Sequence, residues 1–430
     1  MLLSFSVSNY RSVKDAITFS MEPILPKSNK DENLIITDRY VGLKSAVIYG
    51  ANASGKSNLI SAMKFVKDFV LGSATDSNVG NNINVEPFLL SSDINPSSTF
   101  EIVFTADDTR YRYGFTCDTE QVLKEWCFEA KKRAEYPLFL READEINVEN
   151  RFKEGNGLEL KTRNNALFLS VVSQFNGSVS GIITNWFRQF NTISGLGDED
   201  YFRYSAKQYA KPENKPMVLA LLKAADMDIV DLDVTHSSLD PRDLPKDFPE
   251  ELKKLIVKSG GNAKGEMISI RSKHEKFDEN LKLVGHAYLD YHANESKGTQ
   301  KFFSLSGPIL NTIKYGKVLI IDELDARLHP KLTQVIVNIF NSTKSNPHNA
   351  QLIFATHDTN LINRKSFRRD QIWFAEKDQG RATDIYSLAE YNLPDKKGKV
   401  REDQSWEKDY IKGRYGAIPY LGDFSALIAD

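Results

Sequence analysis

The pattern of apolar and polar residues predicts alternating strands and helices in the first part of the chain. Apolar and polar residues alternate over residues 1–11, which predicts a half-buried strand. A second strand is predicted at residues 45–49, Ser-Ala-Val-Ile-Tyr, and it stops at Gly50. Between residues 59 and 70, apolar side chains recur every three or four positions, as they do on one face of a helix. This order of elements predicts an α/β domain.

The pattern changes twice farther along the chain. Residues 74–98 are rich in Asn, Ser, Asp and Pro and predict a loop, and strand signals then continue to about residue 140. From about 164 to 255 the spacing becomes mostly helical, with helices expected at 217–227 and 250–257. Strands return at residue 267, and the α/β pattern continues to about residue 388. We therefore expect an α/β fold interrupted by a largely helical insertion.

Composition limits the class of protein. The chain has 430 residues, 41% hydrophobic and 27% charged, which suggests two or three structural units with a large core. Its net charge of −2 provides no general positive field, so nucleic-acid binding would need local basic patches. The two cysteines, Cys117 and Cys127, have no metal-binding spacing and are expected to be free thiols. Because no apolar run approaches the roughly 20 residues that span a bilayer and no signal peptide is evident, we expect a cytoplasmic protein without a membrane partner.

Residues 50–57 form a predicted phosphate loop. They read Gly-Ala-Asn-Ala-Ser-Gly-Lys-Ser, match GxxxxGK[ST], and lie between the predicted strand and helix. The glycines allow backbone N–H groups to point at phosphate oxygens, and the helix N-terminus adds partial positive charge. Lys56 is expected to contact the β- and γ-phosphates, and Ser57 is expected to coordinate Mg²⁺. The expected nucleotide-contacting residues of this segment are Gly50, Asn52, Ala53, Ser54, Gly55, Lys56, Ser57 and Asn58.

A carboxylate pair follows a second predicted strand. Residues 318–321 are four consecutive large aliphatics, which is typical of a strand covered on both faces. Asp322, at the end of this strand, is expected to hold Mg²⁺ directly or through water. Glu323 is then placed to orient or deprotonate an attacking water. Together with the phosphate loop, this pair predicts Mg²⁺-dependent nucleotide binding and hydrolysis.

Three further segments resemble motifs of ABC-type ATPases, in the branch of RecF, SMC-like and OLD-type proteins. Residues 322–330, Asp-Glu-Leu-Asp-Ala-Arg-Leu-His-Pro, resemble the Walker B motif and the D-loop, which includes Asp325. Residues 352–358 resemble the switch strand, with His357 as the switch histidine, and residues 295–300 resemble a degenerate signature motif. The order of the motifs is that of the class. The resemblance implies an ATPase head with a mixed central sheet, in which Asp325 and His357 belong to the nucleotide site, and it favours ATP over GTP.

Ser296 and Gly298 match the serine and the glycine of the signature motif. A serine hydroxyl and a backbone N–H at a helix N-terminus can form a second anion-binding site. In this class that site contacts the γ-phosphate bound by a partner subunit, which implies ATP sandwiched within a homodimer or a higher homo-oligomer. Taken alone, Ser-x-Gly-Thr is more often a helix cap. Residues 74–104 contain no glutamine, so the Q-loop role of the class is unassigned.

The closer resemblance is to stand-alone AAA-family ATPases of bacterial defence loci, the RloA- and AbiL-like family, with the ATPase of the PARIS system as a further candidate. Residues 9–12 (Asn-Tyr-Arg-Ser), the short signature motif and residues 413–419 carry this resemblance. It implies an ATP-driven switch in antiviral defence or abortive infection that responds to a phage-derived trigger. The effector would be encoded separately, for example a Toprim- or RloB-like nuclease, because residues 359–430 are too few for a Toprim domain.

This interpretation divides the chain into three parts. Residues 1–160 would carry the phosphate loop and a β-rich lobe, residues 161–265 a mainly helical insertion, and residues 266–430 the signature, Walker B, D-loop and switch histidine. The alternative function is a RecF-like DNA-repair ATPase that binds DNA directly. Its candidate contacts are Lys131, Lys132, Arg133, Lys161 and Arg163; Arg364, Lys365, Arg368 and Arg369; and Arg188 with Trp186, Phe187 and Phe190. A separate basic run, Lys396, Lys397, Lys399 and Arg401, lies in the last forty residues. Such clusters are more often solvated faces or core stripes.

Overall fold

The computed structural model describes most of the chain as two compact units. The described residues are 1–24, 31–76, 78, 80–92, 94–131, 134–238, 266–391, 400 and 405–419. The first unit comprises Met1–Leu196, Asn311–Ala326 and Thr333–Asp430, and the second comprises Gly197–Leu310 and Arg327–Leu332. The helix expected at 250–257 and the basic residues Lys396, Lys397, Lys399 and Arg401 lie outside the described residues.

A six-stranded mixed sheet forms the centre of the first unit, as predicted. Its order is β11-β15-β16-β5-β17-β18; the first five strands are parallel, and β18 is antiparallel to β17. All residues of β5 and β16 are buried, as expected for strands covered on both faces. The strands are β11 (Phe190–Ser194), β15 (Val318–Asp322), β16 (Gln351–Ala355), β5 (Ser45–Tyr49), β17 (Ile372–Lys377) and β18 (Thr383–Ser387).

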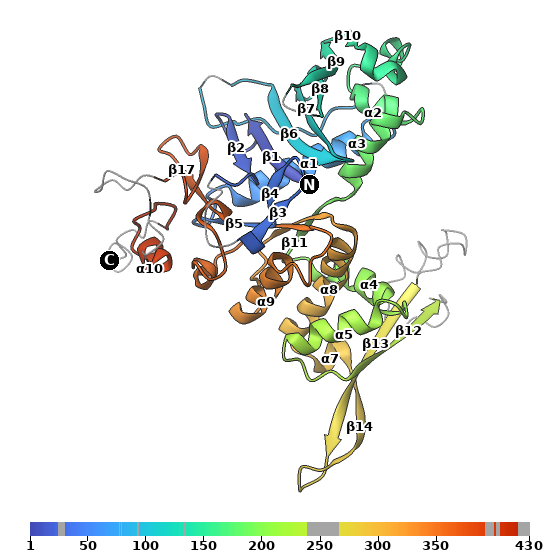
Figure 1. Cartoon of the computed structure of the whole chain (residues 1–430), viewed down its shortest axis with the longest axis vertical. Coiled ribbons are helices and arrows are strands. Elements are labelled where there is room, and N and C mark those ends of the chain that lie inside the picture. The colour runs from blue at the N-terminus through green and yellow to red at the C-terminus, as the bar shows by residue number, and fades with distance from the viewer. Residues whose placement is uncertain are drawn as a thin grey trace, which may run out of the picture. The chain divides into compact units, whose positions relative to one another are not determined.

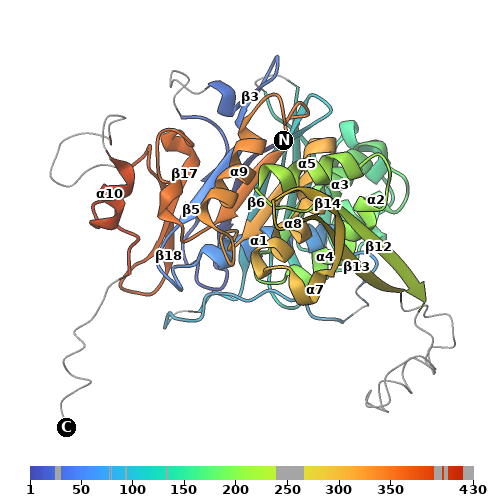
Figure 2. The ribbon, with the colours of Figure 1, turned by 90° about the horizontal axis from the view of Figure 1, so that it is seen from below.

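Helices of the first unit cover its sheets. The helix α1 (Lys56–Gly72) follows β5 directly and buries the apolar face that the sequence predicts, including Leu59, Met63 and Val66. Two further helices, α2 (Phe168–Ser173) and α3 (Ser178–Arg188), pack against α1. Near the other edge of the sheet, α10 (Trp406–Ile411) lies beside β17 and β18 in Figure 2. The short 3-10 helices are η1 (Asp31–Asn33), η2 (Asn150–Gly155), η3 (Glu159–Lys161), η5 (Thr359–Leu361) and η6 (Arg369–Gln371).

An antiparallel sheet of seven strands, in the order β10-β9-β8-β7-β6-β1-β2, is the second large sheet of this unit (Figure 1). It confirms the strands predicted near the N-terminus and between residues 98 and 140, and Cys117 and Cys127 are free and buried in it. The strands are β1 (Leu2–Ser8), β2 (Ile17–Ser20), β6 (Ser98–Ala106), β7 (Thr109–Cys117), β8 (Val122–Ala130), β9 (Tyr136–Glu142) and β10 (Glu145–Val148), and a separate hairpin joins β3 (Leu34–Ile36) to β4 (Val41–Leu43).

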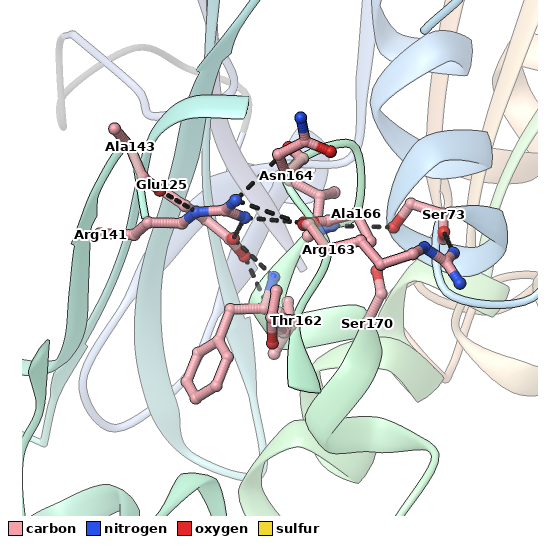
Figure 3. Close-up of polar contacts among 12 residues, drawn as sticks. Ser73, Glu125, Arg141, Ala143, Thr162, Arg163, Asn164, Ala166 and Ser170 are labelled. Atoms are coloured by element: carbon pink, nitrogen blue, oxygen red, sulfur yellow. Dashed lines mark hydrogen bonds and ion pairs between the residues drawn. The ribbon is translucent and has the colours of Figure 1, made fainter. Parts of the chain in front are cut away.

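A buried ion pair connects this sheet to the helices (Figure 3). Arg141 on β9 lies 3.8 Å from Glu125 on β8, and both side chains are almost fully buried. Glu125 accepts hydrogen bonds from the backbone N–H groups of Phe168 (2.6 Å) and Leu169 (3.0 Å) at the start of α2. Arg141 donates to the carbonyl oxygens of Ala143 and Ala166, at 2.7 Å each. The pair therefore has hydrogen-bond partners on both sides, as a buried charge requires.

The second unit combines helices with a small sheet. Its helices include α4 (Asp198–Tyr209), α5 (Lys215–Ala224) and α7 (Tyr291–Asn294), while α8 (Lys297–Tyr315) and α9 (Pro330–Asn341) each contribute residues to both units. The sheet has the order β12-β13-β14. Its strands are β12 (Asp231–Ser238), β13 (Glu266–Phe277) and β14 (Leu283–Asp290). The β13–β14 hairpin extends away from the helices of this unit (Figure 1), and most residues of β14 are exposed.

The described residues of the segment 161–265 form the strands β11 and β12 as well as the helices α2, α3, α4 and α5. Phe190, which the spacing places on a helix, begins β11, and β11 pairs with β15 in the central sheet. The parallel hydrogen bonds to β15 decide the extended conformation there, which local spacing does not reveal. The boundary between the two units accordingly falls after Leu196. Pro308 lies inside α8, which continues through it as one helix. Among the described residues, no helix is long and apolar enough to cross a membrane.

Candidate nucleotide-binding site

The predicted phosphate loop connects β5 to α1 in a conformation that needs glycine at two positions. Gly55, at the N-terminal end of α1, has φ = 106°, and an added Cβ would overlap the side chain of Thr383. A Cβ at Gly50 would overlap the carbonyl oxygen of Ala375. Ala53 also has a left-handed φ of 62°. The loop therefore adopts a backbone shape that side chains at its two glycines would disrupt.

Hydrogen bonds from distant segments hold this loop. The hydroxyl of Thr383 on β18 donates to the carbonyl oxygen of Ser54 (3.0 Å) and lies 2.8 Å from the hydroxyl of Ser12. Asn58 donates to the same Ser12 hydroxyl at 2.6 Å. We call Ser12, Asn58 and Thr383 the loop clasp. Sequence reasoning did not assign Ser12 or Thr383 to the site, although Ser12 belongs to the Asn-Tyr-Arg-Ser segment that carries the family resemblance.

Lys56 is buried inside the loop. Its Nζ donates to the carbonyl oxygens of Gly50 (2.8 Å) and Ala51 (3.0 Å). Burial lowers the pKa of the Lys56 ammonium, while the carboxylates of Asp322 and its neighbours Glu323 and Asp325 act in the opposite direction. The structure thus brings the predicted lysine and all three predicted carboxylates into one electrostatic environment.

Buried carboxylate oxygens gather at the carboxyl ends of β15 and β16. Among the described residues, Oδ1 of Asp322, Oδ1 of Asp325 and Oδ2 of Asp358 are buried without a hydrogen-bond partner. Such atoms are costly unless a cation or a donor satisfies them, so the site fits a metal ion. No cluster of three or more His, Cys, Asp or Glu residues in the described part of the chain could hold a metal alone. Mg²⁺ suits this arrangement because it is usually bound by one or two carboxylates together with substrate phosphates.

His357 follows β16 and contacts the predicted D-loop. Its backbone N–H donates to Oδ2 of Asp325 at 3.2 Å. Partial burial lowers the pKa of the His357 imidazole, as does the charge of Lys56, while the nearby carboxylates raise it. The imidazole is therefore biased toward its neutral form, which can accept a proton or a hydrogen bond.

Gly195, which sequence reasoning missed, shapes the turn that carries Glu323. Its N–H donates to the carbonyl oxygen of Asp322 at 2.6 Å, and an added Cβ would overlap the carbonyl oxygen of Glu323. Glu323 itself has a left-handed φ of 53°. The only local signal for this role is that Gly195 comes two positions after the β-branched pair Thr192-Ile193, and the helical interpretation of the segment obscured it.

The two signature residues, Ser296 and Gly298, belong to the second unit, whereas every other predicted site residue belongs to the first. The Ser296 hydroxyl accepts a hydrogen bond from the backbone N–H of Thr299 at 3.0 Å and so caps α8. A Cβ at Gly298 would lie 3.1 Å from the carbonyl oxygen of Arg327, so the backbone approaches closely here. The structure confirms the helix cap, and the phosphate contact stays a prediction.

Some of the candidate DNA contacts are occupied within the chain, whereas the side chains of Lys131, Lys161, Arg188, Arg364 and Lys365 are exposed. Trp186, Phe187 and Phe190 are buried, and Trp186 stacks on Phe104 with ring centroids 4.0 Å apart. Arg163 donates to the carbonyl oxygen of Ser73, and Arg368 forms a buried pair with Asp370 at 2.8 Å. Two members of the first cluster, Lys132 and Arg133, lie outside the described residues. The aromatic stripe is part of the hydrophobic core.

Comparison with solved structures returns SMC heads at low identity. An SMC head domain from Thermotoga maritima is 14% identical, with a TM-score of 0.42 over 90% of this chain and 98% of that one. An SMC head bound to the C-winged helix domain of ScpA is 12% identical, with a TM-score of 0.43 over the same shares. An Smc head with an extended coiled coil, bound to the C-terminal domain of ScpA derived from Pyrococcus furiosus, is 13% identical, with a TM-score of 0.38 over 90% and 96%.

Comparison with curated proteins gives no significant match. A family model does match, and it is described as "AAA domain, putative AbiEii toxin, Type IV TA system". It covers residues 45–363, about three quarters of the chain. The matched segment contains the phosphate loop, the carboxylates after β15, the signature residues and His357. The chain therefore belongs to this family, which agrees with the motif-based prediction of an ABC-type AAA ATPase of the abortive-infection type.

Proposed function

We propose that the chain binds and hydrolyses ATP with Mg²⁺ and uses this cycle as a molecular switch. The observation that carries the proposal is that Lys56 lies inside the phosphate loop, where it interacts electrostatically with Asp322, Glu323 and Asp325, and that Asp325 in turn accepts a hydrogen bond from the backbone of His357. The Lys56 ammonium can bind the phosphates of a triphosphate. The carboxylates beside it, of which Asp322 and Asp325 each have a buried oxygen without a hydrogen-bond partner, can hold the metal ion that accompanies the triphosphate.

Each group has a distinct role in this proposal. The N–H groups of the loop and of the first turn of α1 bind phosphate oxygens, and Lys56 exchanges its carbonyl contacts for the β- and γ-phosphates. Ser57 and Asp322 would hold Mg²⁺, which would supply charge neutralisation at the phosphates when bound. Glu323 orients and deprotonates the attacking water, and His357 donates or accepts a hydrogen bond near the γ-phosphate. Asp325 supports His357 through its bond to the histidine N–H.

The signature residues imply a second copy of the chain. Ser296 and Gly298 lie at the N-terminus of α8, a 19-residue helix whose dipole favours an anion. In the proposed assembly they contact the γ-phosphate bound by another protomer, so two ATP molecules join two copies. ATP binding and hydrolysis would then change the geometry of the oligomer.

The switch is proposed to control a separately encoded effector in bacterial antiviral defence, such as a Toprim- or RloB-like nuclease, in response to a phage-derived trigger. Membership of a family named for a toxin of a type IV toxin–antitoxin system supports this role. Co-purification of the product of a neighbouring toxin or nuclease gene would test the partnership. The direct DNA-binding alternative loses support because its aromatic residues are buried in the core.

Phosphate release by the purified chain tests the enzymatic proposal. Replacement of Glu323 by Gln should abolish turnover while ATP still binds, and replacement of Lys56 by Ala should abolish binding. Glu145→Gln, at an exposed position on β10, serves as a matched control and should retain the parental rate. Normal turnover by the Glu323→Gln variant would refute the assignment of the base.

A further inference from the structure

Glu295, directly before the signature serine, is bound to a strand of the small sheet. Its Oε1 accepts a hydrogen bond from the hydroxyl of Ser272 at 2.5 Å and lies 2.8 Å from Nε2 of His274. The side chain of Glu295 is only 11% exposed, and Ser272 is fully buried. Ser272 and His274 are two positions apart on β13 and therefore share one face of the strand. A single carboxylate oxygen thus joins the α7–α8 turn to β13.

The backbone of the same turn is fixed from the other side. Nε2 of Gln300, one turn into α8, donates to the carbonyl oxygens of His292 (3.0 Å) and Glu295 (2.9 Å). These bonds satisfy the carbonyl groups at the end of α7. Ser296 lies between the two anchors, so the position of its hydroxyl depends on both.

The charge of Glu295 gives this contact a functional consequence. A carboxylate near a helix N-terminus competes with a phosphate for the same N–H groups and repels it. The bonds to Ser272 and His274 hold the Glu295 carboxylate against β13. The N–H groups at the N-terminus of α8 therefore remain available to bind another anion, such as a phosphate. β13 also forms the exposed hairpin with β14, so the contact connects the signature turn to an outer surface of its unit.

We propose that Glu295 is a positioning residue, which holds Ser296 and Gly298 in the geometry that binds the γ-phosphate carried by a second copy. This inference rests on the proposed ATP sandwich and adds β13 as its support. Loss of the Glu295 contact should weaken association between protomers without weakening the ATP site that each protomer builds from its own phosphate loop.

The test compares Glu295→Ala, Glu295→Gln and the control Glu275→Ala, each in the Glu323→Gln background. Glu275 is an exposed carboxylate on β13, and because it is next to His274 its side chain points to the opposite face of the strand. We expect Glu295→Ala to lower ATP-dependent association about 10- to 100-fold, in the range of supporting residues at other sites. Glu295→Gln should recover most of it, because its amide oxygen still accepts from Ser272, and Glu275→Ala should match the parent.

ATP affinity at dilutions where the chain does not associate provides the readout that separates positioning from a loss of folding. It should be the same in all four proteins, and the melting temperature should change little. The proposal would be overturned if the Glu295→Ala variant associated as strongly as the parent. It would also be overturned if this variant lost as much affinity for ATP as it lost in association. If the Glu323→Gln parent itself does not associate with ATP, the ATP sandwich is wrong, and the positioning role falls with it.

Discussion

Thr383 on β18 offers a sharp test of how the phosphate loop keeps its shape. Replacement by Val exchanges one hydroxyl for a methyl group of similar size. The lost hydroxyl donates to the carbonyl oxygen of Ser54 (3.0 Å) and lies 2.8 Å from the Ser12 hydroxyl. The one methyl group of Thr383, which Val retains, still lies beside Gly55. Thr383→Val therefore isolates the polar part of the loop clasp.

The expected effect follows from these two hydrogen bonds. Each contributes about 0.5 to 1.5 kcal/mol, so their loss removes about 1 to 3 kcal/mol from the loop conformation. If this conformation alone binds ATP, the apparent Kd rises as its population falls. Since 1.4 kcal/mol corresponds to a factor of ten, the Kd for ATP should rise between about 5- and 150-fold.

Titration with ATP and Mg²⁺ in the Glu323→Gln background measures this Kd without turnover. Thr383→Ser, which retains the hydroxyl, is the matched control and should bind with nearly parental affinity. Thermal unfolding of both variants checks that the fold is intact. Unchanged affinity in Thr383→Val, or an equal loss in Thr383→Ser, would refute the idea that the hydroxyl holds the loop.

Two further predictions concern charge. Because the pKa of His357 lies below the ordinary 6.5, its imidazole should stay neutral from about pH 8 to pH 7. The kcat should therefore be constant over this range and fall only below about pH 6.5. A fall in kcat centred above pH 7 would contradict this role. Arg141→Met should cost about 3 to 5 kcal/mol of stability at pH 8, because it leaves Glu125 buried and unpaired. Burial raises the pKa of Glu125 above 4.5, and loss of Arg141 raises it further, so protonation should reduce this cost as the pH falls. Calorimetry at several pH values measures this cost. Lys124→Met, which removes an exposed charge, is the control and should cost at most about 1 kcal/mol of stability. Equal losses of stability in the two variants would contradict the account.

Local sequence signals predicted much of the fold and of the candidate site. The strand at residues 45–49, the phosphate loop and the apolar face of α1 are adjacent in the chain, and the structure has all three in the predicted order. The four aliphatics before Asp322 likewise form a buried strand. These features depend on periodicity and on short motifs, which a single sequence displays directly.

The features that the sequence did not predict depend on contacts between distant segments. Thr383 reaches Ser54 across 329 positions, and nothing around Thr383 marks it as part of a nucleotide site. The strand β11 forms because β15 provides a parallel partner, so local spacing suggested a helix. Gly195 is needed because the turn after β15 approaches it closely. The Glu295 contact with β13 is hidden for the same reason.

The central claim is that ATP joins two copies of the chain through the phosphate loop of one and the signature residues of the other. Light scattering of the Glu323→Gln variant, with and without ATP and Mg²⁺, measures this most directly. The account predicts that ATP doubles the mass of the 48.7-kDa protomer or of its resting assembly, and that Ser296→Arg in the same background abolishes the change. A mass that does not respond to bound ATP, or a response that survives Ser296→Arg, would contradict it.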